Sequence, residues 1–242
     1  MYANMIPYEQ ERDARSSNCW DINPNWRSYK RHMFNFIVFS LACGLVQSAG
    51  FATYNTDSDG FGKCTIPAGS YDHWTSVGPA AFKGSQICGS CVNVTNTDSG
   101  KSTVVHVVDQ CLGCGEEDLN LSLPAFTSIG SNAPNHLPIS WSIVRCPDVT
   151  GNIQYFWETG SNQWWSALQV RNHAEAVASV SYSKSGTGPW KEFTRRDDNY
   201  FTTSGIATPV FFNITSTSGK SIIDSNMIPL EQGGIVSSSA QF

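Results

Sequence analysis

The cysteine distribution is the feature that most restricts how this 242-residue chain folds. Six of its eight cysteines fall in one stretch, at Cys64, Cys88, Cys91, Cys111, Cys114 and Cys146. No cysteine follows Cys146, and the other two, Cys19 and Cys43, lie near the N-terminus. This asymmetry predicts two domains, of which the first contains cysteines and the second does not.

Four of these cysteines form two C-x-x-C pairs, Cys88–Cys91 and Cys111–Cys114, with 19 residues between the pairs. Structural zinc sites use this spacing, because four thiolates can close a tetrahedron around the metal. The alternative is three disulfides, which use all six cysteines. An oxidising compartment favours disulfides over thiolate ligands, so the choice depends on where the protein works.

The segment before the cysteines predicts export. Residues 34–46 are mostly apolar, the basic residues Lys30 and Arg31 precede them, and small residues follow up to Gly50. This pattern is typical of a secretory signal, and the apolar run is too short to span a bilayer comfortably. Either Met33 is the true start or residues 1–32 form a long n-region. Both alternatives remove 1–49 and predict a secreted, extracellular protein.

Composition excludes several classes of protein. Only 14% of residues are charged and 40% are hydrophobic, which excludes a disordered chain. The net charge of −5 argues against nucleic acid as a partner and against binding to an acidic membrane surface. Many Gly, Pro, Ser, Thr and Asn residues with few helix formers predict an all-β protein.

Local patterns place the elements. The β-branched run at 104–108 predicts a strand buried on both faces, and the alternation at 139–143 predicts a half-buried strand. Residues 122–130 predict a short helix with Ser122 as N-cap and Gly130 as its end. Short strands separated by turns over 152–235 predict an immunoglobulin-like β-sandwich.

Two groups of side chains are candidates for chemistry. Asp109 ends the β-branched strand, where its carboxylate can either face a groove or cap a turn. Trp164 and Trp165 are adjacent, and exposed indoles of this kind stack on the apolar faces of glucose rings. Packing in the core is the alternative for this pair, because tryptophan is usually well buried.

These segments, in this order, resemble the expansin family. Residues 50–148 resemble the double-psi β-barrel that expansins share with family-45 glycoside hydrolases. Residues 151–242 resemble the expansin C-terminal domain, a family-63 carbohydrate-binding module, with the closest match at 160–173. The resemblance covers 51–235 and implies an all-β fold: a six-stranded double-psi β-barrel followed by an immunoglobulin-like β-sandwich. It also implies the disulfides Cys64–Cys88, Cys91–Cys146 and Cys111–Cys114, with no metal and no cofactor.

In the barrel, the resemblance implies a groove that carries Thr53, Asn55 and Asp109. The family holds a carboxylate in an Asp-Leu-Ser motif, but Asn120 occupies that position here, and an amide cannot protonate a leaving group. Asp118 lies two residues earlier and is the candidate substitute. Inverting hydrolysis needs two carboxylates, and Asp109 is the only clear one in the groove, so we expect no hydrolysis.

In the second domain, the resemblance implies that Trp164 and Trp165 bind glucan. The family usually has a third aromatic residue in this domain, but the corresponding position here is occupied by Asp198. Tyr200, two residues later, is the candidate to take its role. Asn93, Asn120 and Asn213 begin N-glycosylation sequons, which predicts a glycoprotein.

Together these features predict a secreted, monomeric, non-hydrolytic expansin-like protein of the cell wall. It would bind cellulose and related β-glucans and loosen plant-type or microbial walls, without contacting a membrane once the signal is removed. Two alternatives remain: a weak family-45-like endoglucanase, and a carbohydrate-binding or effector protein without wall-loosening activity.

Overall fold

The computed structural model describes residues 48–56, 62–67, 69–130 and 136–242. The predicted N-terminal extension and nearly all of the predicted signal peptide lie outside the described residues, as do Cys19 and Cys43. No helix among the described residues is long and apolar enough to span a membrane.

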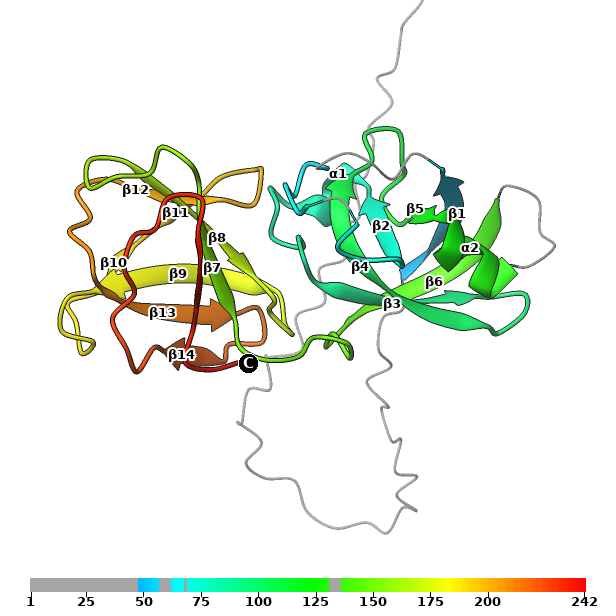
Figure 1. The fold of residues 1–242 in the computed structure, drawn as a ribbon. Helices are drawn as coiled ribbons and strands as arrows, with labels where there is room; N and C mark the ends of the chain where they lie inside the picture. Colours follow the sequence, from blue (N-terminus) through cyan, green and yellow to red (C-terminus); the bar gives the residue numbers. More distant parts are fainter. Residues whose placement is uncertain (1–47, 57–61, 68, 131–135) are drawn as a thin grey trace, which may run out of the picture. The chain divides into compact units, whose positions relative to one another are not determined.

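Six strands close into a barrel in the order β1-β5-β2-β4-β3-β6 (Figure 1). The strands are β1 (Ser48–Asn55), β2 (Trp74–Val77), β3 (Cys91–Asn96), β4 (Ser102–Gln110), β5 (Leu119–Ser122) and β6 (Leu137–Val144). Strand β1 pairs in parallel with β5, β2 pairs in parallel with β4, and the other neighbours are antiparallel. Closure leaves no free sheet edge, since each strand has a partner on both sides.

Two short helices belong to the barrel, α1 (Pro79–Phe82) and α2 (Leu123–Gly130). The predicted cap of α2 is confirmed, because Ser122 Oγ accepts a hydrogen bond from Ala125 N at 3.4 Å. The predicted end is also confirmed. Gly130 is the last helical residue, and a Cβ there would lie 2.4 Å from Leu137 Cδ1, so a larger residue would require the Leu137 side chain of β6 to shift.

The barrel core comes from alternate residues of the strands, including the fully buried Val105 and Val107 of β4. Their neighbours Val104 and Val108 are only half-buried, so the prediction of a strand buried on both faces holds for its centre alone. The outer face of a barrel strand is covered only where a loop packs over it. Here Tyr71 provides that cover by stacking on His106, with ring centroids 3.6 Å apart.

Three disulfides join Cys64 to Cys88, Cys91 to Cys146 and Cys111 to Cys114, with Cα–Cα distances of 5.5, 5.1 and 5.4 Å. This is the pairing that the expansin resemblance implied. Since all six sulfurs are bonded in pairs, none is a thiolate ligand, and the zinc alternative is not the one that the structure adopts.

The rest of the chain forms two antiparallel sheets, in the orders β10-β9-β13-β14 and β11-β12-β8-β7-β15. Their strands are β7 (Gln154–Trp157), β8 (Ser166–Arg171), β9 (Val177–Ser183), β10 (Lys191–Glu192), β11 (Thr194–Arg195), β12 (Phe201–Thr203), β13 (Phe211–Ser216), β14 (Ser221–Ile223) and β15 (Ile235–Ser237). Buried aromatic side chains fill the space between them, with Trp157, Phe193 and Phe212 in mutual contact. This is the predicted immunoglobulin-like sandwich.

The barrel and the sandwich belong to one compact unit, Leu45–Phe242. The predicted boundary at 148–151 falls in the connection between β6 and β7 and stays a prediction.

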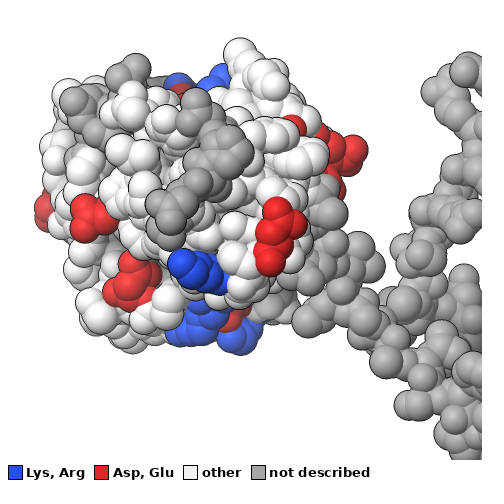
Figure 2. Space-filling view, turned by 90° about the vertical axis from the view of Figure 1, so that its right-hand side faces the viewer, with Lys and Arg blue, Asp and Glu red and all other residues white. Residues whose placement is uncertain are grey.

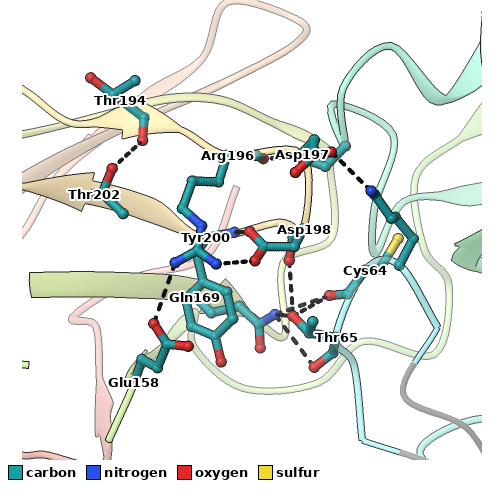
Figure 3. Close-up of polar contacts among 12 residues, drawn as sticks. Cys64, Thr65, Glu158, Gln169, Thr194, Arg196, Asp197, Asp198, Tyr200 and Thr202 are labelled. Atoms are coloured by element: carbon teal, nitrogen blue, oxygen red, sulfur yellow. Dashed lines mark hydrogen bonds and ion pairs between the residues drawn. The ribbon is translucent and has the colours of Figure 1, made fainter. Parts of the chain in front are cut away.

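Hydrogen bonds join the barrel to the sandwich through the short segment 63–65, where the Cys64–Cys88 disulfide loop begins (Figure 3). Thr65 Oγ1 donates to Asp198 O at 2.9 Å, and Gln169 Nε2 donates to Cys64 O at 3.0 Å. An ion pair of 2.8 Å joins Lys63 Nζ to Asp197.

Gly89 of the first C-x-x-C pair meets His173 of the sandwich. Gly89 has a φ of +71°, and a Cβ there would lie 2.8 Å from His173 Nε2. A glycine is therefore required on both conformational and steric grounds. His173 is only 4% exposed, and burial lowers the pKa of its imidazole from 6.5 to about 4.

This buried histidine predicts a loss of stability in acid. As the pH falls, the unfolded chain takes up the proton near pH 6.5, whereas the folded chain takes it up near pH 4. The contribution of His173 to the free energy of unfolding is therefore complete above pH 6.5. It is lost progressively as the pH falls to 4, and the total loss is about 3 kcal/mol. Denaturant unfolding at a series of pH values measures this, and a His173→Asn variant should lose most of the pH dependence in that window. If the free energy of unfolding of the variant falls with pH as steeply as that of the parent chain, His173 is not the source of the pH dependence.

Candidate functional site

Strand register brings four polar residues into one line across the barrel. Thr53 on β1 pairs with Asn120 on β5, Asn120 pairs with Ser76 on β2, and Ser76 pairs with Asp109 on β4. Neighbouring strands lie about 4.8 Å apart, so this polar row spans about 14 Å. Thr53 Oγ1 donates to Asn120 Oδ1 at 3.2 Å.

The polar row unites three residues that were predicted for the groove, Thr53, Asn120 and Asp109. Asn55, the fourth, pairs with Ser122 two residues further along β1. Ser76 was missed, because nothing in its local sequence marks it. It joins the polar row only through strand pairing, at a point where the register of β2 against β4 shifts.

Asp109 holds a loop against the end of β4. Its Oδ1 accepts a short hydrogen bond from Lys63 N. A Cβ at Gly62 would lie 2.5 Å from the Asp109 Cβ, so the main chain of this loop lies directly on the aspartate. One oxygen of the candidate groove carboxylate is therefore already used by the protein itself.

Asp118 is occupied more completely. Its Oδ1 accepts from Phe51 N at 2.8 Å and its Oδ2 accepts from Gly115 N at 3.0 Å. Both oxygens of this carboxylate are therefore engaged by main-chain donors of the barrel itself. The role of Asp118 as a substitute for the carboxylate expected at Asn120 stays a prediction, and the structure shows Asp118 as an anchor for Phe51 N and Gly115 N.

The sandwich presents Trp164 and Trp165 to solvent, with 76% and 43% of their surface exposed. Strict alternation along a strand would have put one indole on each face of the sheet. Strand β8 begins only at Ser166, so both tryptophans lie in the turn before it. Both indoles can therefore face outward, and packing of this pair in the core is not what the structure shows.

The side chain of Asn162 builds this turn. Its Oδ1 accepts from Trp164 N at 2.8 Å and from Trp165 N at 3.2 Å, while its Nδ2 donates to Gly160 O at 3.0 Å. The main chain closes the same turn, with Asn162 N donating to Trp165 O at 2.7 Å. An asparagine that bonds to main-chain groups nearby stabilises a turn in this way. Its position two residues before the first tryptophan is a signal in the sequence that was not used.

Tyr200 does not extend the exposed aromatic surface. It is 7% exposed, and burial is the main cause of the raised pKa of its phenol. The guanidinium of Arg196 lies 5.6 Å from its ring, and Asp198 bonds to both Arg196 and Tyr200 N (Figure 3). Thr65 of the barrel bonds to Asp198 and so ties this loop to the barrel, and the stacking role of Tyr200 stays a prediction.

Cys91, His106 and Cys146 also come together, but this cluster offers no thiolate because the two cysteines form a disulfide. His106 is buried and its Nε2 lies 2.9 Å from Asp148 Oδ2.

The three sequons lie within strands. Asn93 is in β3, Asn120 in β5 and Asn213 in β13, and each side chain is half-buried. Glycosylation at these sites stays a prediction.

Charge is sparse on the face shown in Figure 2. Asp and Glu side chains lie apart from one another, and uncharged residues make up most of the described surface. No extended basic stripe of the kind that phosphate backbones need crosses the described part of this face.

Comparison with known proteins identifies relatives of both parts. Residues 32–136 match the Barwin family. The curated protein Expansin-YoaJ of Bacillus subtilis (strain 168) is 32% identical over 181 residues, which cover 72% of this chain and 76% of the relative. Expansin-like protein 5 of Dictyostelium discoideum is 28% identical over 71% of this chain and 74% of its own length.

Solved structures agree with these relatives. The crystal structure of an expansin from Clavibacter michiganensis superposes with a TM-score of 0.70 and 28% identity, covering 81% of this chain and 97% of that one. An aspartate-to-asparagine mutant of that expansin in complex with cellohexaose gives the same TM-score at 29% identity, with the same coverage. These matches span the barrel and the sandwich together, and the chain belongs to the expansin family.

Proposed function

We propose that this chain is a secreted, non-hydrolytic expansin that binds cellulose and related β-glucans and loosens cell walls. The observation that carries the proposal is the Asn162 turn, which holds two adjacent indoles out of the sandwich. Exposed indoles of this size are costly to leave in water unless a ligand covers them, and sugar rings offer apolar faces of matching shape.

The polar row is the second contact in this proposal. Its hydroxyl, amide and carboxylate groups suit the hydroxyls of a neutral glucan, and they lie in line across the barrel. The Clavibacter expansin provides support, since it was crystallised with cellohexaose. That complex was formed with an Asp-to-Asn mutant, so an asparagine in an expansin is compatible with glucan binding.

The hydrogen bonds of the carboxylates support action without hydrolysis. Asn120 does not titrate, both oxygens of Asp118 accept main-chain hydrogen bonds, and Asp109 is bonded to Lys63 N. An inverting glycosidase needs one carboxyl group that donates a proton and a second that activates water. The polar row supplies one carboxylate in all, which argues against the endoglucanase alternative.

The three disulfides support an extracellular location, because reducing compartments disfavour them. We propose that the mature chain works in the wall as a monomer, without a cofactor, a nucleic acid or a membrane as partner.

The double variant Trp164→Ala/Trp165→Ala should lose binding to cellulose. Its dissociation constant in a pull-down should rise by about tenfold or more, since both stacking faces are removed. Leu112→Ala is the control, because Leu112 is an apolar side chain that is 81% exposed in the barrel. Binding by the parent chain should change little between low and high salt, because stacking is not screened. Retention of the double variant at the parent level refutes this site.

Asn162→Ala should weaken the same binding by about threefold to tenfold with both tryptophans still present. The variant removes the side-chain hydrogen bonds that fix the turn, and each is worth about 1 kcal/mol. Gln163→Ala, in the same turn, is the matched control and should bind as the parent chain does. Equal binding by Asn162→Ala and Gln163→Ala shows that the turn does not need its asparagine.

Incubation with soluble β-glucan should release no reducing ends above the buffer level, while a filter-paper weakening assay should detect activity. An active family-45 hydrolase serves as the positive control for the reducing-end measurement. Release of reducing ends that disappears in Asp109→Asn establishes the endoglucanase alternative instead. Cellulose binding without any weakening of the paper favours the effector alternative.

A further inference from the structure

The barrel has a pocket beside the polar row that the proposed function does not use. It has a volume of about 350 Å³, and its lining includes Asn55, Tyr71, Asp72, Trp74 and Ser122. We call it the Trp74 pocket. Its volume lies near the lower end of the range for small-molecule sites, which begins at about 300 Å³, so it suits a single sugar ring.

Ser122 joins the walls of the Trp74 pocket. Its Oγ accepts from Trp74 N at 3.2 Å and donates to Asp72 O at 2.9 Å, while its main chain pairs with Asn55. The same hydroxyl caps helix α2 by accepting from Ala125 N. Strands β1, β2 and β5 and helix α2 thus hold the pocket in shape before any ligand arrives, which lowers the entropy lost on binding.

The lining has the chemistry of a sugar site. Trp74 and Tyr71 supply aromatic rings, and Tyr71 is fixed by stacking on His106 at 3.6 Å with an interplanar angle of 5°. Asp72 supplies a carboxylate that can accept hydrogen bonds from sugar hydroxyls. Among the described residues that line the pocket, Asp72 is the only charged one, so an anionic sugar is repelled and a neutral one is favoured.

The position of the Trp74 pocket shows which part of a glucan reaches it. The polar row runs across the strands, whereas Asn55 lies two residues beyond Thr53 along β1, on the same face. That separation is about 7 Å along the strand. A glucan backbone that follows the polar row therefore passes beside the pocket, and only a substituent on the backbone can enter it.

We propose that the Trp74 pocket binds a neutral pyranose side branch of a β-glucan whose backbone lies along the polar row. This inference rests on the proposed function, since it assumes that the polar row contacts glucan. It makes the barrel selective for branched over linear chains.

The test compares two β-glucan oligosaccharides of equal backbone length, one linear and one with single neutral pyranose branches. Calorimetry on the parent chain should show about threefold to tenfold tighter binding of the branched one, as expected for one additional aromatic contact. Trp74→Ala should abolish that preference and leave the affinity for the linear oligosaccharide unchanged. Equal affinity of the parent chain for both oligosaccharides overturns the proposal.

A second measurement guards against misfolding of Trp74→Ala. The indole N–H signal of Trp74 can be identified by its loss from the NMR spectrum of Trp74→Phe. The chemical shift of this signal should change when the branched oligosaccharide is added and should not change when the linear one is added. Asp72→Asn keeps the shape of the pocket and should lower the affinity for the branched ligand about threefold, the effect of a charge-assisted hydrogen bond. Asp98→Asn, another exposed aspartate of the barrel, is its control. An indole signal that does not move overturns the proposal.

The outcomes separate this inference from the proposed function. Linear binding that is lost in Trp164→Ala/Trp165→Ala, together with no preference for branches, leaves the proposed function standing and removes the branch pocket. Failure of the parent chain to bind either oligosaccharide removes both.

Discussion

The hydrogen bonds of the segment 62–65 are the constraint on which the rest of the structure depends. Lys63 N donates to the carboxylate of Asp109 in the polar row, and Cys64 N donates to Val108 O at 3.3 Å. On its other side, Cys64 O accepts from Gln169 and Asn199 of the sandwich. The Cys64–Cys88 disulfide fixes the segment in the barrel. One short piece of main chain thus connects the candidate groove to the sandwich that carries the tryptophans.

This arrangement explains why the carboxylates of the barrel suit binding better than catalysis. A carboxylate that accepts main-chain hydrogen bonds is held in one orientation, which stabilises the loop that it anchors. Asp118 and Asp109 both act in this way, toward Phe51 N and Lys63 N. The acidic residues at this surface of the barrel therefore anchor its loops, and their neighbour in the polar row, Asn120, is an amide.

Much of the fold was predictable from the sequence, because local chemistry determines it. Ser122 as a cap and the turn before Trp164 follow from short-range preferences, and the family resemblance supplied the disulfides and the two folds. Local patterns in the sequence say least where distant residues decide the outcome. Tyr200 is buried because Thr65 holds its loop, and Ser76 belongs to the polar row because of a register shift. The Trp74 pocket likewise depends on three strands meeting at Ser122.

Without hydrolysis, the free energy for loosening a wall comes from binding alone. Each hydrogen bond exchanged between protein, glucan and water is worth only about 0.5–1.5 kcal/mol net, so the polar row supplies a few kcal/mol at most. A protein that competed with glucan chains through such contacts alone would dissociate quickly. Stacking on Trp164 and Trp165 buries apolar surface, and it does not require hydrogen bonds to be exchanged between protein, glucan and water. Under the proposed function, retention by the sandwich therefore has to precede any action of the barrel, and the segment 62–65 keeps the two within reach of the same chain.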